Sequence, residues 1–209
     1  MTKSRATTAA EFKAELANDP TYQRMIRRKE EERKKLELVL NSDQRELIQS
    51  CCEVGVPIQS VWDLVNTTEH YPLAIPILVK HLEIEHHPRI LEGIVRALIT
   101  TDSRGVAFNA LVKLFNQTTD SESDLKWLLG MAIAESATKS ELDTIVELAN
   151  DCRHGKRGRE HLPLGLLIAG KEAATPILND WLSDPVLSKN AKKAIGLFRK
   201  GTGAGPRNR

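Results

Sequence analysis

The chain has 209 residues, of which 41% are hydrophobic and only 4% aromatic, and its 30 Lys and Arg residues nearly balance its 28 Asp and Glu residues. This charge balance gives no indication of a nucleic-acid or membrane partner. Three cysteines without metal-ligand spacing are typical of reduced thiols, the first ten residues lack the apolar stretch of a signal peptide, and no apolar run is long enough to span a membrane, so we expect a cytoplasmic protein.

Residues 1–41 predict a helical arm. A short helix ends at Asn18-Asp19-Pro20, where Asp19 can cap a second helix and Pro20 can be its first residue. This second helix is dense in charge and carries the i,i+4 pairs Glu30–Lys34 and Glu31–Lys35. Its apolar stripe is too thin for a strong coiled coil, so we expect it to fold back on the next helices in a monomer.

Residues 42–200 predict a repeat of helix pairs. The run Ala74-Ile75-Pro76-Ile77-Leu78 returns as Ala174-Thr175-Pro176-Ile177-Leu178, and the unit recurs about every 30–37 residues. Such units bury their apolar faces only against their neighbours, which favours an all-α solenoid. Residues 201–209, with three glycines and a proline, predict a disordered tail.

Five pairs are predicted in chain order. In the first pair, Asp43 caps a helix that ends at Gly55, and the second helix begins at Pro57. The other pairs cover 72–82 and 88–99, 104–116 and 121–134, 140–150 and 156–169, and 173–182 and 185–199. Short connections make each helix antiparallel to the one before it.

Two stretches resemble the HEAT-repeat family and, more loosely, the HEAT-like repeats of phycobilisome lyases. They run from Pro76 to Leu98 and from Pro176 to Gly196, and the likeness covers about residues 56–199. The resemblance implies a right-handed α-solenoid of four to five helix pairs. It also implies a ladder of Asp and basic residues between neighbouring repeats, for which Asp184 and Arg89 stand at matching positions. The first stretch lacks the Asp, so the ladder is incomplete.

Four histidines, His70, His81, His86 and His87, lie near Glu83 and Glu85. Their spacing does not match the i,i+4 pattern that places two ligands on one helix face, so we interpret them as polar loop residues and expect no metal.

A second candidate is the basic segment 153–159, which has four fixed positive charges and two glycines that leave the backbone accessible. Together with the C-terminal lysines it predicts nucleic-acid or other polyanion binding as an alternative function. The residues assigned to this alternative are Arg153, Lys156, Arg157, Arg159, Lys189, Lys192 and Lys193.

The tryptophans Trp62, Trp127 and Trp181 are each predicted within a helix and interpreted as packing residues. Because some HEAT-like proteins are DNA glycosylases that use aromatic residues and an Asp, the resemblance leaves Trp62-Asp63 as a weaker alternative. Consecutive helical residues point about 100° apart, which argues against their facing one ligand. A chromophore-lyase role rests on the repeat resemblance alone.

The sequence carries no set of convergent reactive groups, so we expect a non-enzymatic scaffold or adaptor without a cofactor that binds another protein on its concave surface. The candidate partner-binding residues are Arg89, Glu92, Arg96, Lys126, Trp127, Arg157 and Arg159.

Overall fold

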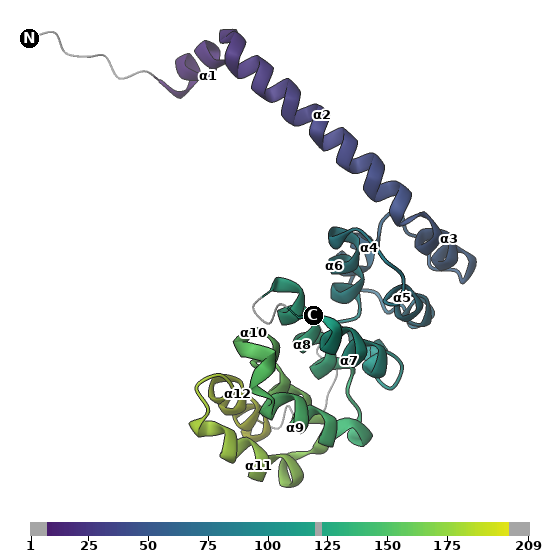
Figure 1. The fold of residues 1–209 in the computed structure, drawn as a ribbon, viewed down its shortest axis with the longest axis vertical. Coiled ribbons are helices and arrows are strands. Elements are labelled where there is room, and N and C mark those ends of the chain that lie inside the picture. The colour runs from purple at the N-terminus through teal and green to yellow at the C-terminus, as the bar shows by residue number, and fades with distance from the viewer. Residues whose placement is uncertain (1–7, 120–122, 201–209) are drawn as a thin grey trace, which may run out of the picture. The chain divides into compact units, whose positions relative to one another are not determined.

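The computed structural model describes residues 8–119 and 123–200, and within them the regular structure is entirely helical, as Figure 1 shows. The prediction of an all-α protein is therefore confirmed at the level of fold class. The chain divides into two compact units, Met1–Ser42 and Asp43–Arg209. The predicted disordered tail, residues 201–209, lies outside the described residues, as does the predicted start of a helix at residue 121.

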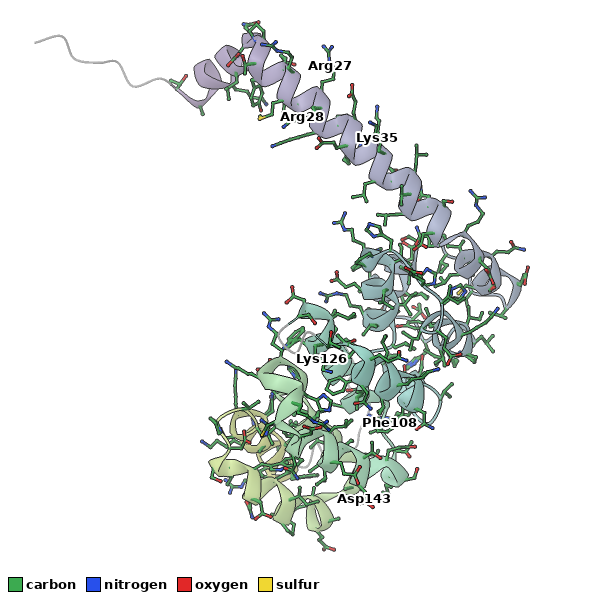
Figure 2. All side chains as sticks on the ribbon, in the orientation of Figure 1. Arg27, Arg28, Lys35, Phe108, Lys126 and Asp143 are labelled. Atoms are coloured by element: carbon green, nitrogen blue, oxygen red, sulfur yellow. The ribbon has the colours of Figure 1, made fainter. Side chains whose placement is uncertain are left out.

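The first unit contains α1 (Ala9–Asn18) and most of α2 (Pro20–Asp43). As predicted, Asp19 stands at the start of α2, where its carboxylate accepts the backbone N–H of Thr21 at 2.7 Å. Salt bridges one turn apart follow α2, including Arg33–Glu30 at 2.7 Å and the expected Lys34–Glu30 at 3.9 Å. None of the residues of α2 is buried, and Figure 2 shows charged side chains projecting from it.

The second unit consists of short α-helices joined by turns and 3₁₀ segments. Its α-helices are α3 (Arg45–Glu53), α4 (Val61–Asn66), α5 (Ile75–His81), α6 (Pro88–Ala97), α7 (Phe108–Gln117), α8 (Asp124–Ser136), α9 (Leu142–Asn150), α10 (Gly155–Arg159), α11 (Lys171–Asp180) and α12 (Ser188–Arg199). Its 3₁₀ segments are η1 (Thr101–Ser103), η2 (Lys139–Glu141), η3 (Cys152–His154), η4 (Leu162–Ala169) and η5 (Trp181–Ser183).

Five of these elements contact one another in chain order. α4 packs on α6, α6 on α8, α8 on η4, and η4 on α12. We call α4, α6, α8, η4 and α12 the inner row. Other elements pack beside this row: α3 packs on α5, α7 on α8, α9 on η4, and α11 on α12. The core consists of aliphatic side chains such as Leu64, Ile94, Leu129, Leu166 and Ala194, all buried.

Hydrogen bonds between successive parts of the unit have a regular spacing. Side chains donate to or accept from groups 30–33 residues away, which is within the period expected from the sequence. These bonds join Tyr71 to Asp102, Arg104 to Glu135, Trp127 to Glu160, Trp181 to Asn150, and Asn190 to Glu160.

The start of the second unit differs from the prediction. Asp43 does not cap α3; it is the last residue of α2, and its carboxylate accepts the distant backbone N–H of His87 at 3.0 Å. The residue before α3 is instead Gln44, whose side-chain oxygen accepts the backbone N–H of Val61 at 3.1 Å. Gly55 ends the helical turn as expected, because its φ of 84° suits glycine.

The predicted helix start at Pro57 is also wrong. α4 begins at Val61, because Ser60 and Asp63 form a capping box. The Asp63 carboxylate accepts the backbone N–H groups of Gln59 and Ser60 at 2.8 and 3.0 Å. This capping role explains Asp63 without reference to a nucleotide ligand.

The predicted single helix over 156–169 is divided into α10 and the 3₁₀ segment η4. Pro163 lacks a backbone N–H and stands in the first turn of η4, which interrupts an α-helical pattern. The glycines of this region lie in close packing: a Cβ on Gly165 would lie 2.7 Å from Ile145 Cδ1. Tertiary packing therefore decides the local conformation here.

Candidate functional site

A groove of about 370 Å³ follows the inner row from α4 to η4 and is the best candidate for a binding site in the described part of the chain. Its apolar lining comes from four elements and their flanking turns. These side chains are Leu64, Val65, Ile99, Leu128, Met131 and Leu164. Threonine hydroxyls and a few charged side chains complete the lining. Mixed apolar and polar walls of this size are typical of sites that take a small molecule or a few side chains of a partner.

One wall of the groove is the connection between α4 and α5. Tyr71 holds this connection in place, because its backbone N–H donates to Asp102 at 3.0 Å and its hydroxyl donates to the carbonyl of Ala97 at 2.7 Å. His70 also contacts Asp102, at 2.9 Å. The wall is therefore fixed to η1 and the end of α6 by hydrogen bonds from neighbouring residues.

Trp127 and His161 line the groove where α8 meets η4. The Trp127 indole N–H donates to the Glu160 carboxylate at 2.5 Å, and the Trp127 ring meets the His161 ring edge-on at 5.0 Å between centroids. Burial lowers the pKa of His161, and the charges of Lys193 and Lys189 lower it further against the opposite effect of Glu160. His161 is therefore favoured in its neutral form near pH 7.

Two charged side chains that line the groove, Arg96 and Glu135, have partners within the chain, and a third, Glu69, is exposed at the α4 end. Arg96 donates to Glu92 one turn away at 2.8 Å, and Arg104 donates to Glu135 at 3.3 Å. These pairs fix the side chains and leave the middle of the groove close to neutral. The predicted residues Glu92, Arg96 and Trp127 thus lie in or beside one groove, and Arg89 is exposed at the start of α6.

Two predicted partner-binding residues are buried instead. Lys126, labelled in Figure 2, is 2% exposed, and its ammonium donates to the carbonyls of Phe115 and Thr118. The ammonium also lies 3.8 Å from the centroid of the Phe115 ring, and burial lowers the Lys126 pKa. The Lys126 ammonium binds carbonyl groups at the end of α7 inside the core, so it is not available to a partner.

Arg159 is 6% exposed, and its guanidinium donates to the carbonyl of Ala149 at 2.6 Å and to Asp184 at 2.7 Å. The Asp184 carboxylate also accepts the backbone N–H groups of Val186 and Leu187. The basic partner of Asp184 is therefore Arg159 of α10. Arg89 makes no such bond among the described contacts.

The basic segment 153–159 does not form one open phosphate-binding loop. Arg153 binds Asp151 at 2.7 Å, which lowers the Asp151 pKa to about 2, and Arg157 binds Asp124 at 2.6 Å. Gly158 is buried, and a Cβ there would lie 3.0 Å from the Phe115 ring. Its backbone is therefore covered by packing. The lysines Lys189, Lys192 and Lys193, by contrast, are all exposed on α12.

His81 and His86, interpreted from the sequence as loop decoration, form a buried hydrogen-bond chain with Asp43. His86 Nδ1 lies 3.2 Å from the Asp43 carboxylate, and His86 Nε2 lies 3.0 Å from His81 Nδ1. Because an ionised carboxylate only accepts, His86 donates to Asp43 and in its neutral form accepts from His81. His81 Nε2 is then a buried acceptor without a partner. Among the described residues, no group of three or more His, Cys, Asp and Glu side chains is placed to hold a metal ion.

Sequence reasoning missed several groove residues, among them Tyr71, Met131 and His161. The spacing of Trp127, Met131 and Glu135 at i, i+4 and i+8 places all three on one face of α8, and this signal could have found Met131. His161 lies in the break between α10 and η4, and because the sequence predicts a continuous helix there, its position could not be inferred.

Comparison of the chain with protein-family models, curated proteins and solved structures finds no match. Among the described helices, none is both long and apolar enough to cross a membrane.

Proposed function

We propose that this chain is a non-enzymatic scaffold or adaptor that binds another protein in the groove of its inner row. The observation that carries the proposal is the composition of the groove. Apolar side chains from α4, the turn after α6, α8 and η4 line the groove, and the charged side chains in its middle, Arg96 and Glu135, are already paired within the chain. Apolar side chains beside paired charges bind a partner mainly by excluding water from apolar surface.

The proposed architecture is a right-handed α-solenoid of four to five HEAT-like pairs. Two observations support it: the inner-row elements contact one another in chain order, and side-chain hydrogen bonds recur at separations of 30–33 residues. A stack of units that contact only their neighbours has this pattern. The bond between Arg159 and Asp184 is a further link of the kind the HEAT resemblance implies.

Several polar groups of the groove have structural roles, which favours binding over catalysis. The Thr100 hydroxyl accepts the backbone N–H of Asp102, and the Thr67 hydroxyl accepts that of Glu69. Glu160, the carboxylate nearest His161, accepts from Trp127. These groups support the walls, and the carboxylate beside His161 is already hydrogen-bonded to the Trp127 indole.

The test is affinity capture from the native organism with wild-type protein and with a groove variant. Met131 lies half-buried in the groove, so Met131→Arg introduces a long charged side chain there and should abolish capture of the specific partner. Lys171→Glu, at an exposed position at the start of α11, is the matched control and should retain capture. Equal recovery of every captured protein by Met131→Arg would remove the groove from the proposal.

Polyanion binding is the second candidate, and the exposed lysines Lys189, Lys192 and Lys193 favour it. Their i, i+3, i+4 spacing gives α12 one positively charged face. Fluorescence anisotropy with labelled duplex and single-stranded oligonucleotides tests this candidate. It predicts binding at ~50 mM salt that falls steeply as salt rises, whereas no binding at that salt concentration would exclude it.

A further inference from the structure

A positively charged part of α12 lies beside the η4 end of the groove. α12 packs on η4, and the side-chain N–H of the buried Asn190 donates to the carbonyl of Glu160 at 2.5 Å. This bond fixes the α12 backbone beside His161, the next residue in the chain and a groove-lining residue. Lys189 precedes Asn190 and Lys193 follows it by three residues, so the bond also holds both exposed lysines near this end of the groove.

The two ends of the groove differ in charge. At the α12 end, the charges of Lys189 and Lys193 both act on His161, and these two positive charges exceed the one negative charge of the nearby Glu160. At the α4 end, the exposed carboxylate of Glu69 lies in the groove wall. Between them the lining is apolar or internally paired. A bound segment therefore meets positive charge at one end only.

We infer that the groove binds a short peptide segment of a partner protein, with apolar side chains on the α6–α8 lining and acidic residues beside Lys189 and Lys193. This inference rests on the proposed function and adds the chemistry and direction of the partner segment. The charge difference fixes the direction, because an acidic group is attracted to the α12 end and repelled by Glu69 at the other.

The size and charge of the groove favour a peptide over a nucleic acid. A volume of about 370 Å³ accommodates a few apolar side chains and is at the low end of ligand pockets, which span roughly 300–1,000 Å³. A phosphate backbone needs positive charge along its whole length. Here Arg96 is bound to Glu92, and Glu69 and Glu135 are both in the lining, so the positive charge ends near η4.

The experiment selects binders from a displayed library of random short peptides on the full-length protein. Selected peptides should combine apolar residues with acidic residues toward one end. The double variant Lys189→Glu/Lys193→Glu should bind them about tenfold or more weakly at low salt. The matched double variant Lys139→Glu/Lys171→Glu makes the same charge change at exposed positions on η2 and α11 and should bind them as wild type does.

Met131→Arg and Thr101→Arg each fill part of the groove. They distinguish failure of the inferred acidic segment from failure of the proposed groove. Circular dichroism and thermal melting identify whichever of them keeps the fold. If a folded groove variant loses binding while Lys189→Glu/Lys193→Glu binds like wild type, the inferred acidic segment is wrong and the proposed groove stands. If no peptide is selected, or if the selected peptides bind folded groove variants unchanged, the proposed groove fails as well. Displacement of the peptides by a single-stranded oligonucleotide at ~50 mM salt would also overturn the inference.

Discussion

Arg159 and Asp184 form a largely buried ion pair, with their side chains 7% and 26% exposed and 2.7 Å between Arg159 Nη2 and Asp184 Oδ2. Asp184 uses its other oxygen to accept the backbone N–H groups that lead into α12. Burial alone would raise the Asp184 pKa, but these hydrogen bonds and Arg159 hold it below its ordinary value. The pair joins the end of α10 to the turn before α12, so one contact connects two segments of the second unit.

Truncation of either partner should be costly, because it leaves the other charge buried and unpaired. We expect Arg159→Met and Asp184→Ala each to lower the free energy of unfolding by about 3–5 kcal/mol, and the double variant by clearly less than the sum. Urea unfolding measures these values. The exposed pair Lys80–Glu46 is the control, and Lys80→Met should change stability by no more than about 0.5 kcal/mol. Additive losses for Arg159→Met and Asp184→Ala would show that the pair is not coupled.

Lys126 should stabilise the fold through hydrogen bonds that no apolar side chain can replace. Lys126→Met leaves the carbonyls of Phe115 and Thr118 without this donor, and we expect a loss of about 1–3 kcal/mol in urea unfolding. Lys113→Met, which removes an exposed ammonium bound to Glu83, is the matched substitution and should be nearly neutral. Similar stabilities for both variants would contradict the structural role of Lys126.

Close packing of α8 on α10 requires a glycine at position 130. A Cβ there would lie 2.5 Å from the carbonyl oxygen of Gly158, so Gly130→Ala should lower the thermal midpoint and destabilise the protein by about 1–3 kcal/mol. A Cβ on Gly196 in α12 meets open space, and Gly196→Ala should stabilise the protein by about 0.5–1 kcal/mol. The two substitutions should therefore change the thermal midpoint in opposite directions, and thermal melting checks this result.

Stability should decrease as the pH falls below about 7, because buried histidines are disfavoured in their charged form. Burial lowers the pKa of His81, and its neighbour His86 adds to the effect against Glu46 and Asp43; burial likewise lowers the pKa of His154 and of His161. The unfolded chain binds protons near pH 6.5, before these folded-state histidines do, so acidification favours unfolding.

Urea unfolding at about pH 7.5 and about pH 5.5 measures this effect. The free energy of unfolding should be lower at the acidic pH, and His81→Gln should show a smaller difference between the two values. A free energy of unfolding that is equal or higher at about pH 5.5 would contradict the effect assigned to the histidines.

The fold class and most helix positions follow from local patterns. The prediction of α2 succeeds because Asp19 and Pro20 are strong start signals, and that of α6 because Pro88 opens a regular apolar pattern. The capping role predicted for Asp43 is wrong because its carboxylate binds His87, 44 residues away, and no local pattern reports that contact. For the same reason the side chains of Lys126 and Arg159 were expected at the surface. A charged side chain is usually exposed. Only the folded chain brings together the internal acceptors that allow Lys126 and Arg159 to be buried.

The groove was predicted in part. Arg96 and Trp127 could be inferred because both lie on second helices of predicted pairs. Tyr71 and His161 could not, because Tyr71 lies in a connection and His161 lies in the break between α10 and η4. The repeat pattern suggests which elements of the inner row contact each other. It does not specify which residues of those elements meet.

The most direct test of the account is site-specific photo-crosslinking in the native cell, with a benzoylphenylalanine in place of the exposed Thr68 in the groove wall or in place of Lys171 on α11. The account predicts that irradiation attaches one defined protein to position 68, that Lys189→Glu/Lys193→Glu reduces this product, and that position 171 yields no such product. The same products at both positions, or none at position 68, would contradict the central claim that the groove binds a protein partner.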